Sequence, residues 1–289
     1  MASLKEIKNR IASVKNTLKI TSAMKMVASA KLHKAQTAIG NKLPYEQKLH
    51  HILSGLLQDD ALHKAMHDDL GFGNPHGHSP VVLQDVSSDE IPVKDKVNRI
   101  ALVVFSSNGS LCGSFNANVI KHFHSIVGQL ENNGYSHGDI DIYAVGKKVA
   151  DAARKAGFIL KADLSEIADK PGYDDAFDLA NGLVDSFTEG EVSQVVLLYS
   201  HFASPVSQPV VRENYLPLAM HDLDEGAEPV DYIREPDPIS LVKSLLPMVL
   251  MLKMYTVMLD ANAAEHAART MAMQIASDNA KDLIDELTL

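Results

Sequence analysis

Each end of this 289-residue chain carries a helical repeat much longer than an ordinary globular helix. Near the N-terminus the apolar positions are spaced alternately by three and four residues, and they are Leu4, Ile7, Ile11, Val14 and Leu18. This spacing places them on one face of a helix, as at the a and d positions of a coiled coil. No Gly or Pro occurs from residue 2 to Ile39, and Gly40 is the first stop signal. A helix of that length spans about 55 Å.

The C-terminal end repeats the pattern. In EPDPISLV, Asp237 suits the N-cap and Pro238 the first helical position. Pro247 is expected only to kink or restart the helix. The seam positions are Leu245, Met248, Leu252, Tyr255, Leu259, Asn262, His266, Arg269, Met273, Ala276, Ala280, Leu283 and Leu287. Helices this long cannot bury their apolar faces alone, so we predict that the two ends pair as a long antiparallel coiled coil.

Between the ends the pattern becomes that of an α/β domain. RIALVVF (99–105), DIDIYAVG (139–146) and VVLLYSHF (195–202) are typical of buried strands, and helical segments at 116–130, 147–157 and 176–187 separate or follow them. Alternating strands and helices predict a Rossmann-like sheet with right-handed crossovers. SQPVVRENYLPL (207–218) is expected to form an edge strand, because two prolines flank it.

These patterns divide the chain into three parts. Residues 1–57 are assigned to the N-terminal helix, 58–236 to the inserted α/β domain and 237–289 to the C-terminal helix. Within the domain, residues 59–98 are rich in Asp, His, Gly and Pro and have no clear period, so we interpret them as an irregular insertion.

Charge is distributed unevenly along the chain. The net charge is −10, yet residues 1–48 hold ten Lys and Arg against two Glu. This asymmetry indicates an acidic partner for the N-terminal helix, and the alternative is a solvated basic face. A nucleic-acid partner is disfavoured, because residues 49–236 carry 13 basic against 28 acidic residues and no aromatic residues are interleaved with the lysines.

The sequence gives little sign of a membrane span or of cysteine chemistry. No uninterrupted apolar run approaches the roughly 18 residues needed to cross a bilayer, and no secretory signal is visible. Cys112 is the only cysteine, which excludes an intramolecular disulfide and a cysteine-rich metal site. We therefore expect a cytosolic chain without a transmembrane segment of its own.

Two segments contain residue types that are common in ligand-binding or metal sites. SSNGSLCGSFNAN (106–118) follows a strand and opens a helix, where phosphate loops occur, but Gly109 and Gly113 fit neither dinucleotide nor P-loop spacing. A tight turn is favoured there, with Cys112 as a buried thiol rather than a nucleophile. His63, His67, His76 and His78 cluster in the insertion, and the first two suit a metal only if that segment is helical. We expect no catalytic residue, metal or cofactor.

The two long helices also carry positions that do not fit a simple seam. Thr21 and Lys25 occupy the next two seam positions after Leu18. Ile20, Met24 and Val27 form a second apolar stripe, which contacts either a partner or a third helix of the same chain. In the C-terminal helix, Asn262, His266 and Arg269 are consecutive polar seam positions that are expected to weaken packing. Glu265 and Arg269 have the i, i+4 spacing of an ion pair. The alternative to a functional role is an ordinary ion pair on an exposed helix surface.

Several blocks together resemble one family. IKNRIASVKNTLKITSAMKMVASAKLHKAQ closely resembles the opening helix of the gamma subunit of bacterial F-type ATP synthase. SSNGSLCGSFN is similar to that family's Gly-Leu-Cys-Gly turn, with Ser110 in place of the first Gly. ENYLPL, YIREPDP and AEHAARTMAMQIASDNAKDLIDELTL are similar to its later blocks. Residues 59–98 are longer and richer in His than expected, and family members ordinarily continue past the position of Leu289 into a helix with a Thr-Gln-Glu-like signature.

The resemblance implies a non-catalytic rotor. Its shaft would lie inside a ring of alternating alpha and beta subunits, and its globular end would sit on the membrane-embedded c-subunit ring. Rotation driven by protons would then change the nucleotide affinities of the beta subunits. An epsilon subunit would bind the α/β domain. The complex would lie on the cytoplasmic face of the bacterial inner membrane, with this chain as a peripheral subunit.

The resemblance also assigns contact residues. By match to the family motifs, Met24, Lys25, Glu265 and Arg269 would contact the carboxylate-rich lever region of the beta subunits. Lysines suit a sliding contact, since a flexible ammonium group attracts carboxylates without a fixed bidentate geometry. The alternative from the residues alone is a cytosolic α/β enzyme that binds a phosphorylated ligand near residues 106–116 and dimerises through its terminal helices.

Overall fold

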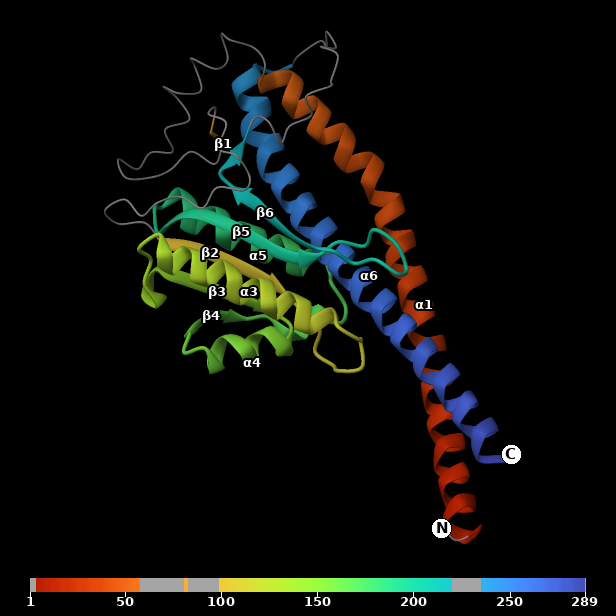
Figure 1. The fold of residues 1–289 in the computed structure, drawn as a ribbon. Helices are drawn as coiled ribbons and strands as arrows, with labels where there is room; N and C mark the ends of the chain where they lie inside the picture. The colour runs from red at the N-terminus through yellow and green to blue at the C-terminus, as the bar shows by residue number, and fades with distance from the viewer. Residues whose placement is uncertain (1–3, 58–80, 83–98, 220–234, 289) are drawn as a thin grey trace.

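Two long helices lie side by side and an α/β domain rests against them (Figure 1). The computed structural model describes residues 4–57, 81–82, 99–219 and 235–288. The helices are α1 (Leu4–Leu57) and α6 (Pro238–Thr288), and the two chain ends lie at the same end of the rod. The predicted fold class is confirmed: antiparallel terminal helices are paired, and the α/β domain is inserted between them.

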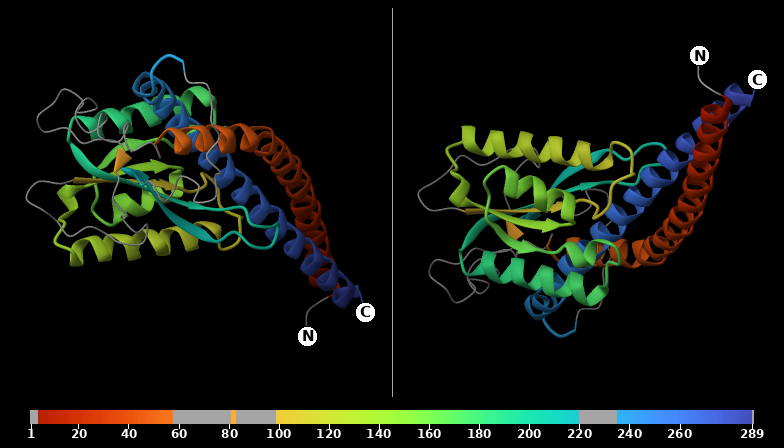
Figure 2. Two further views of the ribbon diagram at one scale, coloured as in Figure 1. Left: turned by 90° about the horizontal axis from the view of Figure 1, so that it is seen from above. Right: turned by 90° about the horizontal axis from the view of Figure 1, so that it is seen from below.

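Helix α1 does not stop at Gly40, the first stop signal in the sequence. It continues through Gly40 and Pro44 to Leu57, the last residue of the segment assigned to the N-terminal helix. The part beyond Gly40 turns away from the line of the N-terminal part (Figure 2). Such a bend fits a proline inside a helix, because its ring displaces the preceding turn and it donates no backbone hydrogen bond. Packing of Leu49 and Leu53 into the core compensates for these two weak helix formers.

Small side chains line the middle of the contact between the two long helices. Leu32 and Ala35 of α1 form a buried cluster with Ala263 and Ala267 of α6. Nearer the chain ends, the buried hydroxyls of Thr21 and Ser277 lie 2.8 Å apart. Thr21 was predicted at a seam position, and this hydrogen bond satisfies its hydroxyl there.

The other predicted seam residues differ in their surroundings. Leu4 is exposed, whereas Ile7, Ile11, Val14 and Leu18 are partly buried and Leu252, Leu259 and Met273 are buried. Tyr255 packs its ring edge-on against Tyr173 of the α/β domain, with centroids 5.7 Å apart. That contact differs from the predicted seam position, because it joins α6 to the domain.

The sheet has five strands in the order β4-β3-β2-β5-β6. Their bounds are β2 Arg99–Phe105, β3 Ile140–Val145, β4 Leu160–Asp163, β5 Val192–Ser200 and β6 Val210–Leu216. The first four are parallel, and β6 pairs antiparallel with β5 at one edge, as the flanking prolines predicted. The opposite edge strand, β4, was not predicted. A separate pair joins β1 (Val81–Val82) to β7 (Leu218–Ala219).

Helices cover both faces of this sheet. On one face α3 (Phe115–Asn132) and α4 (Lys147–Lys155) pack on Ile100, Leu102 and Val104 of β2. On the other face α5 (Tyr173–Thr188) and α6 pack on Ala101, Val103 and Phe105. Burial on both faces explains why the central strands are continuous apolar runs. Short turns of 3-10 helix complete the domain at His137–Asp139 and Ser165–Ala168.

Helix α6 is unusually long and apolar. Within Ile239–Thr288 there is an 18-residue window long and apolar enough, by length and composition, to cross a membrane. Half of that window is buried inside the protein. This window is not an uninterrupted apolar run, because isolated polar residues separate its apolar residues, many of which are Ala and Met. Such a composition also suits a helix enclosed between a second helix and a sheet.

The histidine cluster cannot be placed. His63, His67, His76 and His78 lie outside the described residues, as does all of the 59–98 insertion except Val81 and Val82.

Candidate functional site

Several large apolar side chains are exposed on the projecting part of the rod, and we call them the apolar belt. Ile20 and Val27 of α1 are 60% and 59% exposed, and Met26, Met271 and Ile275 are exposed nearby in the paired register. In the part of the chain that the structure describes, no third helix covers these residues. Met24 lies partly buried among these residues. Large exposed side chains concentrated on one segment indicate an interaction surface.

Most of the positively charged side chains of the rod lie on α1. Lys5, Lys8, Arg10, Lys15, Lys19, Lys31 and Lys34 are all exposed. Lys25 is partly buried and lies close to Asp278 of α6. The pKa of Asp278 is lowered by hydrogen bonds from Gln274 and Lys281 and, more weakly, by the charge of Lys25. The belt therefore combines apolar contact area with a cationic face.

The predicted pair Glu265 and Arg269 faces the chain's own α/β domain. The Arg269 Nη2 donates to Glu265 Oε1 over 2.6 Å, and its Nη1 donates to the carbonyl of Ser110 over 2.5 Å. Glu265 is only 4% exposed, and burial raises the pKa of its carboxyl against the opposing effect of Arg269. The alternative of an exposed surface pair is wrong, because the ion pair lies inside the junction between α6 and the 106–114 loop.

The polar seam positions have a similar role. The Asn262 amide donates to the carbonyl of Ala168 over 3.0 Å. Together with Arg269, it attaches α6 to two loops at the carboxyl edge of the sheet. These residues were expected to weaken the coiled coil, but they instead strengthen the contact between the helix and the domain.

His266 is the polar seam residue that stays unsatisfied. It is 3% exposed, and its Nδ1 has no hydrogen-bond partner among the described residues. Burial, together with the nearby charges of Lys31 and Arg269, lowers the pKa of the imidazole to about 4. The ring is therefore neutral at physiological pH.

The 106–114 loop forms the tight turn that the sequence favoured. Leu111 and Gly113 have left-handed backbone conformations, with φ of 68° and 60°. Cys112 is buried, and the amide of Asn116 donates to its Sγ over 3.0 Å. The buried thiol is thus confirmed. A side chain at Gly109 would lie 3.4 Å from the Arg269 guanidinium, which shows how closely that group covers the turn.

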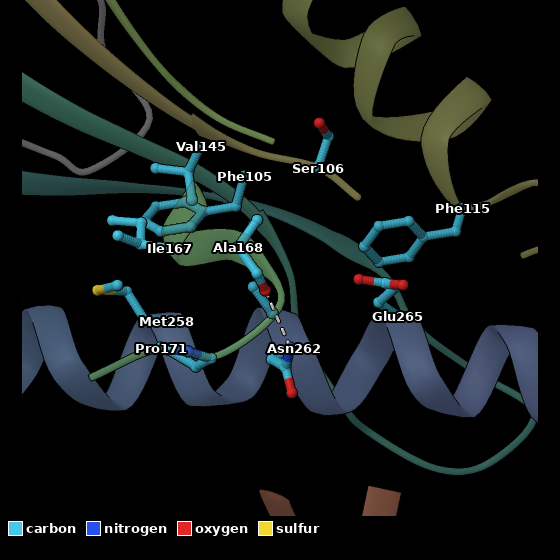
Figure 3. Close-up of a pocket in the computed structure, with 11 residues that line it drawn as sticks. Phe105, Ser106, Phe115, Val145, Ile167, Ala168, Pro171, Met258, Asn262 and Glu265 are labelled. Carbon is cyan, nitrogen blue, oxygen red and sulfur yellow. Dashed lines mark hydrogen bonds between the residues drawn. The ribbon is translucent and has the colours of Figure 1, made fainter. Parts of the chain in front are cut away.

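A cavity of about 20 Å³ separates α6 from the carboxyl edge of the sheet (Figure 3). Phe105, Phe115, Met258, Asn262 and Glu265 are among the residues that line it. Its volume suits about one water molecule. The 106–116 segment therefore has no room for a phosphorylated ligand in this cavity.

Comparison with known proteins identifies the family. The family model described as ATP synthase matches residues 3–289. The ATP synthase gamma chain of Phocaeicola vulgatus is 49% identical over all of this chain and 92% of its own length. The chain belongs to the ATP synthase gamma chain family. The gamma chain of Bacteroides fragilis is 48% identical, again over all of this chain and 92% of that protein.

Solved structures share the gamma-chain fold. A chain in the central stalk and c-ring of the Tetrahymena thermophila mitochondrial ATP synthase matches with a TM-score of 0.55 and 21% identity, covering 89% of this chain and 99% of that one. A chain in the Euglena gracilis rotor matches with a TM-score of 0.58 and 17% identity, covering 98% and 94%. At these identities the likeness concerns the fold alone.

Sequence reasoning missed several residues of the junction in this gamma-chain fold. Glu213 of β6 and Lys253 of α6 form an ion pair of 2.6 Å, and Asp260 accepts hydrogen bonds from His201 and from the backbone of Phe202. The only signal in the sequence was that charged residues interrupt otherwise apolar segments. Such a signal does not reveal which element supplies the partner.

Proposed function

We propose that this chain is the central stalk of an F-type ATP synthase, the non-catalytic rotor subunit that couples proton flow to ATP synthesis and hydrolysis. One observation carries this proposal above the others: a two-helix rod projects from an α/β domain in a chain that matches the gamma family along almost its whole length. Membership of the complex follows from the family. The alternative of a cytosolic enzyme has no support from these findings.

The apolar belt and Lys25 would contact the surrounding ring of alpha and beta subunits. The exposed side chains of Ile20 and Val27 provide contact area, and Met24 and Lys25 lie beside them. A carboxylate-rich collar suits this face, because lysines attract carboxylates without a rigid geometry. Glu265 and Arg269, which were also expected to contact the lever, are instead enclosed between α6 and the 106–114 loop, so they would hold the domain on the rod rather than contact the ring.

The α/β domain would lie outside the ring. We propose that it contacts the membrane c-subunit ring and an epsilon subunit, which places the complex on the cytoplasmic face of the bacterial inner membrane. This arrangement leaves the projecting half of the rod for the catalytic ring, consistent with the position of the exposed belt near the tip.

The test is charge reversal at Lys25 in the assembled complex. Lys25→Glu should lower the protons pumped per ATP hydrolysed, because it places a carboxylate against the proposed acidic collar. Lys155→Glu is the matched control, since Lys155 is exposed on α4, away from the rod. If Lys25→Glu leaves both the coupling ratio and the ATPase rate at the level of the control, Lys25 does not contact the ring.

A further inference from the structure

Five polar side chains from four elements of the junction form two hydrogen-bonded groups that meet at neighbouring positions of α6. They are Glu46 of α1, Thr256 and Lys253 of α6, Glu213 of β6 and Tyr199 of β5. We call this set the transverse chain. It crosses the rod and the adjacent strands, whereas the helix axes run along the rod (Figure 1).

Each contact in the transverse chain has hydrogen-bond geometry. The Thr256 hydroxyl donates to Glu46 Oε2 over 2.6 Å. The Lys253 ammonium lies 2.6 Å from Glu213 Oε1, and the Tyr199 hydroxyl donates to Glu213 Oε2 over 2.9 Å. Lys253 and Thr256 are three residues apart, so they project from neighbouring positions of α6 towards different partners.

The transverse chain is shielded from water. Glu46 and Tyr199 are 7% and 8% exposed, and the side chains of Lys253 and Glu213 are 29% and 27% exposed. Burial raises the pKa of Glu46, with the Thr256 hydrogen bond and Lys253 opposing it and the Glu213 charge reinforcing it. Two carboxylates thus lie around one ammonium group, so loss of Lys253 would leave both without their counter-charge.

The surroundings of the transverse chain are apolar. Leu49 and Leu53 of α1 pack with Val249 and Met254 of α6 in the same core cluster as the sheet. Apolar packing is non-directional, so it resists separation of surfaces more than their sliding. Hydrogen bonds require a defined distance and angle. The polar contacts are therefore the part of this junction that resists rotation of the rod relative to the sheet.

The other polar attachments of the junction involve α6 without α1. Asp260 binds the loop after β5, Asn262 binds Ala168 and Arg269 binds Ser110. The transverse chain differs from these three attachments in that it also includes α1, through Glu46. It consequently fixes both helices of the rod to the sheet.

We propose that the transverse chain is the torsional joint of this subunit: it fixes the rotational position of α1 and α6 on the α/β domain, so that rod and domain turn as one body. Its members are positioning residues. This inference rests on the proposed rotor function and extends it, since it names where torque passes from the domain into the rod.

The experiment uses the full chain, free and in the assembled ATP synthase. Lys253→Met removes the ammonium and keeps most of the apolar stem. Its matched control is Lys243→Met, because Lys243 is an exposed lysine on the same helix and lies away from the apolar belt. Lys253→Arg keeps the positive charge at this position and tests whether the charge pairing itself matters. Tyr199→Phe offers a milder break if Lys253→Met fails to assemble.

Two readouts are expected to change together. Amide exchange at 46–50 and 210–216 should become about fivefold faster in Lys253→Met, the loosening expected from loss of one buried charged contact. Protons pumped per ATP hydrolysed should fall below the value for Lys243→Met at a temperature where both variants remain folded. Lys253→Arg should retain coupling near the value of the unaltered chain, since it keeps the charge that faces Glu213 and Glu46.

The contrary outcomes are distinct. If Lys253→Met couples as well as Lys243→Met, or if the folded Lys253→Arg variant couples no better than Lys253→Met, the torsional joint is wrong. If the unaltered chain does not assemble with alpha and beta subunits, the proposed function is wrong, and the exchange measurement on the free chain then decides alone whether the transverse chain holds the rod on the sheet.

Discussion

Acidification should destabilise this protein through His266. The imidazole is buried without a partner for Nδ1 among the described residues, and its pKa is about 4, compared with 6.5 for a free side chain. Between these values the unfolded chain binds a proton that the folded chain does not. The stabilisation is therefore complete above the unfolded pKa and is lost as the pH falls towards the folded pKa.

The size of this effect follows from the two pKa values. Lowering the pH from 7 to 5 should cost about 2 kcal/mol at this residue, because the unfolded imidazole becomes protonated while the folded one remains neutral. For a chain of this size, that corresponds to a decrease in Tm of about 4 °C. Carboxylates such as Glu265 contribute their own pH dependence, so the residue must be isolated by substitution.

The assay compares urea unfolding of the full chain at pH 7 and pH 5 with that of His266→Gln. The variant cannot titrate at this position, so its stability should fall about 2 kcal/mol less than that of the unaltered chain. His122→Gln is the control, since His122 is an exposed histidine on α3. Equal losses in the unaltered chain and in His266→Gln would refute the reasoning, because they would show that a charged imidazole is tolerated in the seam.

Three further predictions concern stability, measured by urea or thermal unfolding. Thr21→Val should cost about 1 kcal/mol by leaving the Ser277 hydroxyl unpaired, and adding Ser277→Ala should recover most of that loss. Gly146→Ala should cost more than about 2 kcal/mol, because φ is 107° and the new Cβ would lie 2.2 Å from the Ser106 carbonyl oxygen; wild-type stability would contradict this. Arg269→Met should cost about 3 kcal/mol, since it leaves Glu265 buried without its partner, and the loss should shrink in Arg269→Met with Glu265→Gln.

Much of the fold was predictable because the spacing of the apolar residues matches the helices and strands that they form. The 3–4 spacing from Leu4 to Leu18 has one structural interpretation, and the run 99–105 is apolar throughout because both of its faces are covered. Strand β4 was missed, since its four residues are alternately half-buried and exposed at a sheet edge. Gly40 was misinterpreted because local propensity cannot register the tertiary packing that carries α1 past it.

The candidate site was less predictable for a geometric reason. Helix α6 is buried against α1 on one side and against the α/β domain on the other, so its apolar surface is wider than a single seam. A repeat read from the sequence assigns one stripe and cannot say which neighbour each residue meets. Asn262 and Arg269 therefore appeared as defects of a coiled coil, although their partners are backbone carbonyls of distant loops.

The rod is supported along only part of its length. Where α6 lies against the sheet, three layers resist deflection together, but nearer the termini each helix has only the other (Figure 1). Such an object is a cantilever, and a transverse load on its free end produces the largest curvature where the support stops. Elastic energy from uneven pushing would accumulate there, just past the hydrogen bond of Arg269 to the Ser110 carbonyl. The stiffness of the two helices at this position then determines how smoothly stepwise forces on the tip are transmitted to the α/β domain.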